Sequence, residues 1–230
     1  MLREALGVPL QGDRWWKKLL LGGGCLVISF GIVPLWVLLG YLIRFTDGLV
    51  EDSDEIPPSF EYWGLLMSRG LGAFGICVFY LFVPTVVLLV GVFVLLIAPV
   101  NNSVSPAQAR LPLTVAAAIY PFALYALPAA LLHYAAVDKF RAGFSVGQLR
   151  RLWFSWAYAR SWLVAAILVV VLHLLSIPVA LTAIGVLAVP SLLFYSYVVA
   201  TYVIASETRE TLRELSDDAL PSETRPDARR

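Results

Sequence analysis

Residues 70–109, GLGAFGICVFYLFVPTVVLLVGVFVLLIAPVNNSVSPAQA, contain no Asp, Glu, Lys or Arg. This run is roughly twice as long as the ~20 apolar residues that cross a hydrocarbon core as a helix. Further charge-free runs cover residues 19–43, 111–137 and 161–206. Because backbone polar groups in lipid must be satisfied within their own segment, such long runs are typical of membrane helices. The sequence predicts an all-α fold, a polytopic bundle of membrane helices.

The composition of the chain agrees with this class. The 230 residues are 60% hydrophobic and 14% charged, with a mean hydropathy of +0.80, whereas soluble domains are about 45–50% apolar and about 25% charged. A net charge of +1 gives no general argument for nucleic-acid binding. Cys25 and Cys77 fall within apolar runs and do not form a metal pair. We expect neither a cofactor nor a metal.

Proline and polar breaks divide the chain into about five or six membrane segments. "APVNNSVSPAQAR" separates the second segment from the third, and "SIP" at 176–178 separates the last two. Residues 207–230 predict a polar cytoplasmic tail, a short helix followed by disorder, because pairs of opposite charge give way to a polar, proline-bearing sequence. We expect a single integral membrane domain over 1–206, with segments near 19–44, 68–98, 112–136, 157–176 and 180–206.

The first segment has two interpretations. Residues 19–44 form either one helix kinked at Pro34 or a short re-entrant hairpin that turns around "FGIVP" at 30–34. With the hairpin, only Arg110 of the 17 Lys and Arg residues lies outside, so the positive-inside rule favours it. Both interpretations remain open at this point. The hairpin places the N- and C-termini in the cytoplasm of a multi-pass protein of the cell membrane.

"FSVGQLRRLWFSWAYARSWL" (144–163) has the pattern of an amphipathic interfacial helix. Leu149, Leu152 and Trp156 share one face at 100° per residue, and Arg151 lies opposite. A basic amphipathic helix with Trp and Leu on its apolar side lies in the plane of the headgroups. We expect five cations in and beside this stretch to contact lipid headgroups: Lys139, Arg141, Arg150, Arg151 and Arg160.

Three stretches of this kind precede proline-containing apolar segments. "DRWWKKLL" (13–20) and "FEYWGLLMSRGL" (60–71) resemble the stretch at 144–163 in position and composition. They suggest a faint internal repeat of a surface helix followed by a hairpin, as occurs in some transporters. The alternative is that any helix entering a bilayer favours Trp and Arg at its interface.

Several motifs resemble a known membrane family. "IVPLWVLLGYLIRFTDG" (32–48), "EDSDEIPPSFEYWGLL" (51–66), "RGLGAFGICVFYLFVP" (69–84) and "FRAGFSVGQLRRLWFSWAYARSWLVA" (140–165) are similar to the archaeal family called domain-of-unknown-function 4013. The resemblance covers roughly 12–206, and Gly40-Tyr41 and Arg69-Gly70-Leu71 are its most particular parts. It implies a helical membrane protein and assigns no activity. A more distant similarity is to the membrane domain of some glycerophosphodiester phosphodiesterases, whose hydrolase domain this sequence lacks.

Two glycine-rich motifs have structural explanations that outweigh the functional ones. "GLGAFG" (70–75) matches G-x-G-x-x-G, but no strand precedes it and no acidic residue follows before Asp138. Small residues at the start of a membrane helix instead favour close packing of helices. "LLLGGGCL" (19–26) lacks the Lys-Ser or Lys-Thr of a phosphate loop and marks a hinge or the close approach of another backbone.

Polar candidates within the membrane segments are few. His133 and His173 are ionisable residues in predicted spans, where a functional role is the default hypothesis. No carboxylate accompanies either, so a ligand or proton-relay role competes with ordinary packing. Tyr195 is one of several hydroxyl-bearing residues that could line a polar cleft or bond between helices. We take His173 and Tyr195 as the intramembrane candidates.

The acidic stretch "TDGLVEDSDEIPPSFE" (46–61) contains six carboxylates and no basic residue. It lacks the glycine and the ligand spacing of a calcium loop, so we expect a solvated linker.

The sequence therefore predicts a non-enzymatic membrane protein that organises lipids or partner proteins. Its expected partners are membrane lipids, and other membrane proteins or further copies of the chain are also open. The alternative is a facilitated transporter or permease for a neutral or apolar solute. An intramembrane enzyme is disfavoured because neither paired acids nor an H-E-x-x-H motif occurs.

Overall fold

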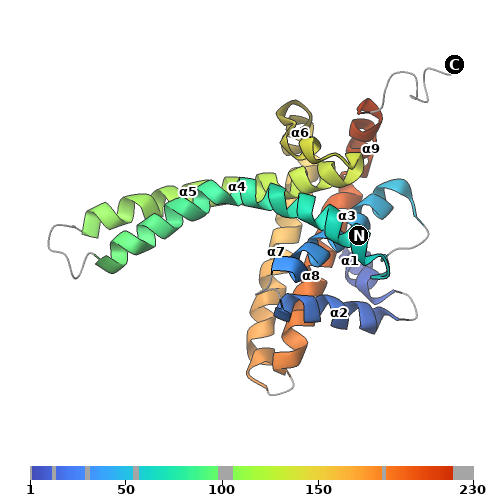
Figure 1. Ribbon diagram of the computed structural model, residues 1–230, viewed down its shortest axis with the longest axis horizontal. Helices are drawn as coiled ribbons and strands as arrows, with labels where there is room; N and C mark the ends of the chain where they lie inside the picture. The colour runs from blue at the N-terminus through green and yellow to red at the C-terminus, as the bar shows by residue number, and fades with distance from the viewer. Residues whose placement is uncertain are drawn as a thin grey trace.

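A computed structural model describes residues 2–11, 14–28, 32–53, 57–97, 106–182 and 185–219, and these ranges are helical with no strand. The all-α fold predicted from the sequence is therefore confirmed. Two long helical hairpins run in different directions from a shared body (Figure 1). The helices are α1 (Leu2–Gly7), η1 (Val8–Leu10), α2 (Trp15–Ile28), α3 (Ile32–Glu51), α4 (Trp63–Ile97), α5 (Pro106–Val137), η2 (Phe140–Phe144), α6 (Val146–Trp153), α7 (Trp156–Ala180), α8 (Gly185–Glu207) and α9 (Arg209–Asp218).

The described residues of the first apolar run belong to two helices, α2 and α3. Helix α2 has 14 residues and packs mainly against α8, and α3 has 20 residues and packs mainly against α4. Residues 29–31, at the expected turn, lie outside the described residues. Helix α3 also continues to Glu51, well beyond the expected end near residue 44.

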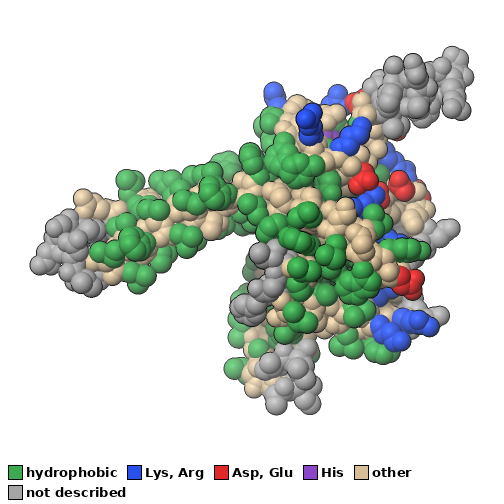
Figure 2. Space-filling model, viewed as in Figure 1, with side chains coloured by type: hydrophobic (Ala, Val, Ile, Leu, Met, Phe, Trp, Pro, Cys, Tyr) green, Lys and Arg blue, Asp and Glu red, His purple; other side chains and the backbone are tan. Residues whose placement is uncertain are grey.

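Five helices of the described ranges are long and apolar enough to cross a membrane: α3, α4, α5, α7 and α8. Helices α4 and α5 form one long hairpin and α7 and α8 the other, and the first runs to the left of the body while the second runs downward (Figure 1). Charged side chains gather over the body where α6, α9 and the end of α3 lie, while the hairpins are covered by apolar side chains (Figure 2). This separation of charged and apolar surface is typical of a membrane protein.

The break between the last two helices comes later than the sequence suggested. Helix α7 passes through Pro178 and ends at Ala180, rather than ending near "SIP" at 176–178. Proline breaks a helix by removing one backbone donor and by crowding the preceding turn. Pro178 nevertheless lies inside α7, and the helix continues for two residues beyond it, so proline alone did not mark the boundary.

Glycines set the distance between α3 and α4. A Cβ atom added to Gly40 would overlap the carbonyl of Leu66, and one added to Gly70 would overlap the carbonyl of Trp36. The two backbones therefore approach each other at this crossing, as small residues in membrane helices permit. "GLGAFG" is thus a packing motif, and its first glycine meets Gly40, the other particular part of the family resemblance.

The glycine triplet of α2 has the same role against α8. A Cβ atom on Gly22 would overlap the ring of Phe194, and one on Gly23 would overlap Ser191. A Cβ atom on Gly24 would meet nothing within 4 Å. Of the two interpretations that the sequence left open for this motif, the structure supports the close approach of another backbone.

The two long hairpins are joined at a proline in α5. Pro128 has no N–H, so the carbonyl of Leu124 loses its usual partner four residues on. The indole Nε1–H of Trp162 on α7 donates to that carbonyl over 3.0 Å. One turn earlier on α7, the Tyr158 hydroxyl accepts a hydrogen bond from the Ala129 N–H and donates one to the Tyr125 carbonyl, at 3.1 and 2.5 Å.

These contacts form a clasp, by which we mean Tyr158 and Trp162 bound to the α5 backbone around Pro128. The Tyr158 side chain is fully buried. Its hydroxyl lies between two backbone groups that bond directly to each other in an uninterrupted helix. Because unpaired backbone groups in lipid cost several kcal/mol each, the clasp both repairs α5 and fixes α7 against it.

We expect Tyr158→Phe to destabilise the fold by about 1–3 kcal/mol, because it removes the hydroxyl from two buried backbone groups. The measurement is reversible unfolding in detergent. Tyr62→Phe is the matched control, since Tyr62 is largely exposed and should change stability by less than about 0.5 kcal/mol. Equal effects of the two changes would contradict the clasp.

A second prediction concerns the α3–α4 crossing. Gly70→Ala should lower stability by about 1–3 kcal/mol or more, because the added methyl group forces the two backbones apart. Gly64, at the start of the same helix, has nothing within 4 Å of an added Cβ atom. Gly64→Ala should therefore leave stability unchanged or slightly raised. A neutral Gly70→Ala variant in the same unfolding assay would show that the helices are not tightly packed there.

Candidate functional site

The charged end of the molecule is built from η2, α6 and α9, which cover the end of α5, and we call these elements the cap. Leu149 and Leu152 of α6 and Leu212 and Leu215 of α9 are completely buried in the common core. The Ser216 hydroxyl of α9 also donates to the carbonyl of Ala136 over 3.0 Å. The cap is therefore a folded part of the protein and not a loose surface attachment.

The single interfacial helix expected over 144–163 is wrong. Helix α6 ends at Trp153, and Ser155 begins α7 by accepting a hydrogen bond from the Tyr158 N–H at 3.5 Å. Tyr125 of α5 donates its hydroxyl hydrogen to the Trp153 carbonyl at 2.6 Å, which satisfies a carbonyl at the end of α6. The apolar face of α6 is buried against protein, whereas a helix lying in lipid would expose it.

The predicted headgroup cations nevertheless lie at the surface. Three of them belong to the cap, Arg141, Arg150 and Arg151, and a fourth, Lys139, directly precedes η2. All four are exposed, and Figure 2 shows basic side chains gathered over the end of the molecule that carries α6. Arg160, the fifth, is exposed on α7, just beyond the cap.

These exposed cations differ in their ion pairing. Arg151 pairs with Asp218 of α9 at 2.9 Å, and both side chains are about half exposed. No ion pair joins Lys139, Arg141, Arg150 or Arg160 to another residue of the described ranges. Their charges are therefore available to an anionic group outside the chain.

Two aromatic side chains stand beside the basic surface at the junction of α6 and α7. Phe154 is 82% exposed and Trp156 is 80% exposed. Exposed aromatic rings next to arginines are typical of the level where membrane and water meet. The junction therefore combines cations with apolar anchors, although the helix predicted to supply both is interrupted there.

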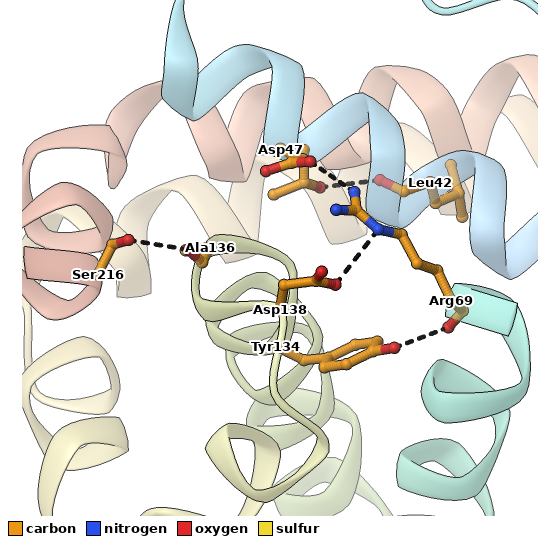
Figure 3. A network of polar contacts seen from close by, with 8 residues as sticks. Leu42, Asp47, Arg69, Tyr134, Ala136, Asp138 and Ser216 are labelled. Atoms are coloured by element: carbon orange, nitrogen blue, oxygen red, sulfur yellow. Dashed lines mark hydrogen bonds and ion pairs between the residues drawn. The ribbon is translucent and has the colours of Figure 1, made fainter. Parts of the chain in front are cut away.

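The half-buried arginines, in contrast, are held by carboxylates. Arg69 of α4 pairs with Asp47 of α3 at 2.5 Å and with Asp138, beyond the end of α5, at 3.2 Å (Figure 3). The Tyr134 hydroxyl donates to the Arg69 carbonyl at 3.2 Å, and a Cβ atom on Gly72 would overlap that hydroxyl. One arginine thus ties the ends of three helices together.

The expected solvated linker at 46–61 is therefore wrong over part of its length. Residues 46–51 continue α3, and Asp47 and Asp52 are structural partners of arginines. Asp52 contacts both Arg209 and Arg213 of α9. Residues 54–56 of the stretch lie outside the described residues. Charge composition alone could not reveal these partners because they come from distant segments.

Two of the aspartates end helices in a backbone conformation that usually favours glycine. Asp52 follows α3 with φ 59°, and Asp138 follows α5 with φ 52°. The Ser53 N–H bonds the Gly48 carbonyl at 3.0 Å, the hydrogen bond that characterises a Schellman helix end. Asp tolerates left-handed backbone better than most residues. Asp52 and Asp138 each also place their carboxylate against an arginine of another helix.

The intramembrane candidates do not come together in one site. His173 bonds the Val169 carbonyl through Nδ1 at 2.7 Å, and its Nε2 lies 3.4 Å from the Tyr197 hydroxyl on α8. Tyr195 instead donates to the carbonyl of Leu6 at 2.6 Å and so holds α1 against α8. Each side chain has a local structural partner.

His133 is completely buried at the base of the cap. Its Nδ1 bonds the carbonyl of Ala142 at 2.8 Å, which requires the hydrogen on Nδ1 and fixes η2 against α5. The other nitrogen, Nε2, has no hydrogen-bond partner within the described part of the chain. The packing interpretation given for this residue fits these contacts.

These features define an all-α protein whose apolar helices fit an integral membrane protein with a charged cap. A scan against protein-family models matches residues 24–181 to the family "Protein of unknown function (DUF4013)". The match covers more than half of the chain, so the chain belongs to this family. Comparisons with curated proteins and with solved structures find no match.

The matched residues span from Gly24, the last glycine of the triplet in α2, to just beyond the end of α7. They include the α3–α4 glycine crossing, the Arg69 ion pairs and the clasp at Pro128. Sequence reasoning missed the roles of Tyr158, Trp162 and the aspartates. A signal for the first two existed, because Pro128 implies an unpaired carbonyl at Leu124, but the donor could not be chosen from many candidates.

We expect the two carboxylates around Arg69 to differ in importance. Asp47→Asn should cost about 1–3 kcal/mol, because the Asp47 and Arg69 side chains are only 21% and 17% exposed. Asp138→Asn should cost less than about 1 kcal/mol, because Asp138 is 59% exposed and solvent screens its charge. Both variants are compared by unfolding in detergent at low salt. A larger loss for Asp138→Asn would contradict this ranking.

Proposed function

We propose that this chain is a non-enzymatic protein of the cell membrane whose cap gathers anionic lipid headgroups. The observation that supports this proposal most is a difference in ion pairing: some basic side chains are paired with carboxylates and others are not. Arg69, Arg209 and Arg213 hold the fold together through carboxylates. Lys139, Arg141 and Arg150, in contrast, are exposed and have no ion pair with another residue of the described ranges.

The surroundings of these cations favour lipid over a soluble ligand. Phe154 and Trp156 are exposed next to them, and apolar hairpins extend from the same body. A cation near an anionic membrane surface contributes about 1 kcal/mol to attraction. Lys139, Arg141 and Arg150 together would therefore provide about 3 kcal/mol, equivalent to a factor on the order of 100 in binding.

The proposal also includes an orientation. We place the cap, both termini and the connection between α3 and α4 on the cytoplasmic side, where positively charged segments are retained. Arg110, near the outer end of the α4–α5 hairpin, is then the exception, as the hairpin interpretation of the sequence expected.

Two adjacent arginines provide a matched test. We expect Arg150→Gln to weaken binding to anionic lipid several-fold, because it removes an unpaired charge. Arg151→Gln should have a smaller effect, because Asp218 already offsets the charge of Arg151. The measurement is binding of purified protein to nanodiscs that contain phosphatidylglycerol, with phosphatidylcholine nanodiscs as the reference.

Arg110→Gln is the control for the loss of one positive charge elsewhere, and it should leave this binding unchanged. Asp218→Asn should increase binding, because it frees Arg151. If Arg150→Gln binds anionic nanodiscs as well as the unchanged protein does, the cap is not the lipid-binding surface.

A further inference from the structure

The two long hairpins are unequal in length. Helix α4 has 35 residues and the apolar span of α5 has 28, which correspond to about 52 and 42 Å. Helix α7 has 25 residues and the span of α8 has 20, or about 37 and 30 Å. A bilayer core is about 30 Å thick. The α4–α5 hairpin therefore exceeds one bilayer core much more than the α7–α8 hairpin does.

A segment longer than the hydrocarbon thickness commonly tilts to remain within it. Figure 1 shows the α4–α5 hairpin leaving the body in a different direction from the α7–α8 hairpin. Both hairpins fit one bilayer if the longer one is strongly tilted. The greater length and the divergent direction are thus consistent with each other.

Within the described part of the chain, the hydrogen bonds that join the α4–α5 hairpin to other elements end partway along the hairpin. On α4, Tyr80 donates to the carbonyl of Gly143 at 3.0 Å. On α5, the Leu124 carbonyl accepts the indole hydrogen of Trp162. Beyond these anchors, the hairpin projects away from the body (Figure 1).

Each leg carries a proline just beyond its anchor. Pro84 follows Tyr80 on α4, and Pro121 precedes Leu124 on α5. Thr85 and Tyr120, the neighbours of these prolines, share a hydrogen bond of 2.9 Å. Both prolines therefore lie at one level of the hairpin. Proline removes a backbone hydrogen bond and bends a helix, so this level is where both legs are weakest.

The part beyond this level, residues 85–97 and 106–120, is the distal arm. Its buried residues within the described ranges are Gly91 and Ala116. A Cβ atom on Gly91 would overlap Leu113 of the other leg, so the two legs pack tightly together. Large side chains such as Leu89 and Phe93 are more than 60% exposed. The two legs of the distal arm are packed against each other, and the exposed surface of the arm is mostly apolar, with Gln108 and Arg110 exposed near its end.

We propose that the distal arm is a lipid-contacting lever that responds to the hydrophobic thickness of the bilayer by changing its tilt at the level of Pro84 and Pro121. The clasp at Pro128 keeps the proximal part fixed to α7. In a thicker bilayer the arm stands more upright, and its end approaches the end of the α7–α8 hairpin. This proposal is independent of headgroup binding at the cap.

The test measures distances between pairs of spin labels in bilayers of different acyl-chain length. One pair joins Leu111 on the distal arm to Leu181 at the end of the α7–α8 hairpin, and both positions are highly exposed. Cys25 and Cys77 are replaced by Ser in the labelled protein. Membranes differ in hydrocarbon thickness from about 27 to about 33 Å. Over this range we expect the distance to shorten by on the order of 5 Å in the thicker bilayer.

Two controls separate a hinge from other motions. The pair Val78–Leu181 has one label on the proximal side of the prolines, and its distance should stay constant. Pro84→Ala with Pro121→Ala restores backbone donors to both legs and should reduce the change at Leu111–Leu181 to less than half. A constant Leu111–Leu181 distance, an equal change in the double variant, or an equal change for Val78–Leu181 would each overturn the proposal.

Discussion

The arrangement of this protein depends on the repair of α5 at Pro128. A proline inside a membrane helix leaves a carbonyl that water cannot reach, and the Trp162 indole supplies the missing donor from α7. The Tyr158 hydroxyl then bridges the next backbone pair, Tyr125 and Ala129. Because both donors belong to one face of α7, the two long hairpins are fixed to each other at the defect.

A second constraint acts at the charged end of the molecule, where charged side chains at the ends of α3, α4 and α5 come together. Arg69 enters the space between α3 and α5 because glycines let α3 and α4 approach closely. Asp52 and Asp138 end their helices with left-handed backbone and turn their carboxylates toward arginines. Asp47, Asp52 and Asp138 thus pair with arginines of other helices. Cations of the cap such as Arg150 are left without partners, and this contrast underlies the proposed role in lipid binding.

The far half of the α4–α5 hairpin lies beyond the contacts that hold the rest of the hairpin to the body. Neighbouring helices hold α4 as far as Tyr80 and α5 from Leu124 onward. Beyond these residues, the described parts of the two legs pack against each other and carry many exposed apolar side chains. A lipid-responsive arm requires a rigid body, a base that the clasp holds in place, and an apolar end that is free to tilt. The cap and the distal arm lie toward opposite ends of the α4–α5 hairpin, so the two proposed roles involve different parts of the molecule.

The sequence by itself determined the class of this protein. Charge-free runs longer than a bilayer core admit helices and little else, and glycines in such runs indicate close packing. It also placed Arg150 and its neighbours at the surface, because their charge excludes them from the apolar core. It did not determine where Phe154 and Ser155 interrupt a helix, since the periodicity of apolar residues continues across that break. Only the tertiary structure decided that Asp47, Asp52 and Asp138 serve arginines, and that Tyr158 and Trp162 repair α5. These hydrogen bonds and ion pairs join residues that are distant in sequence, and the local sequence around each residue is compatible with many other partners.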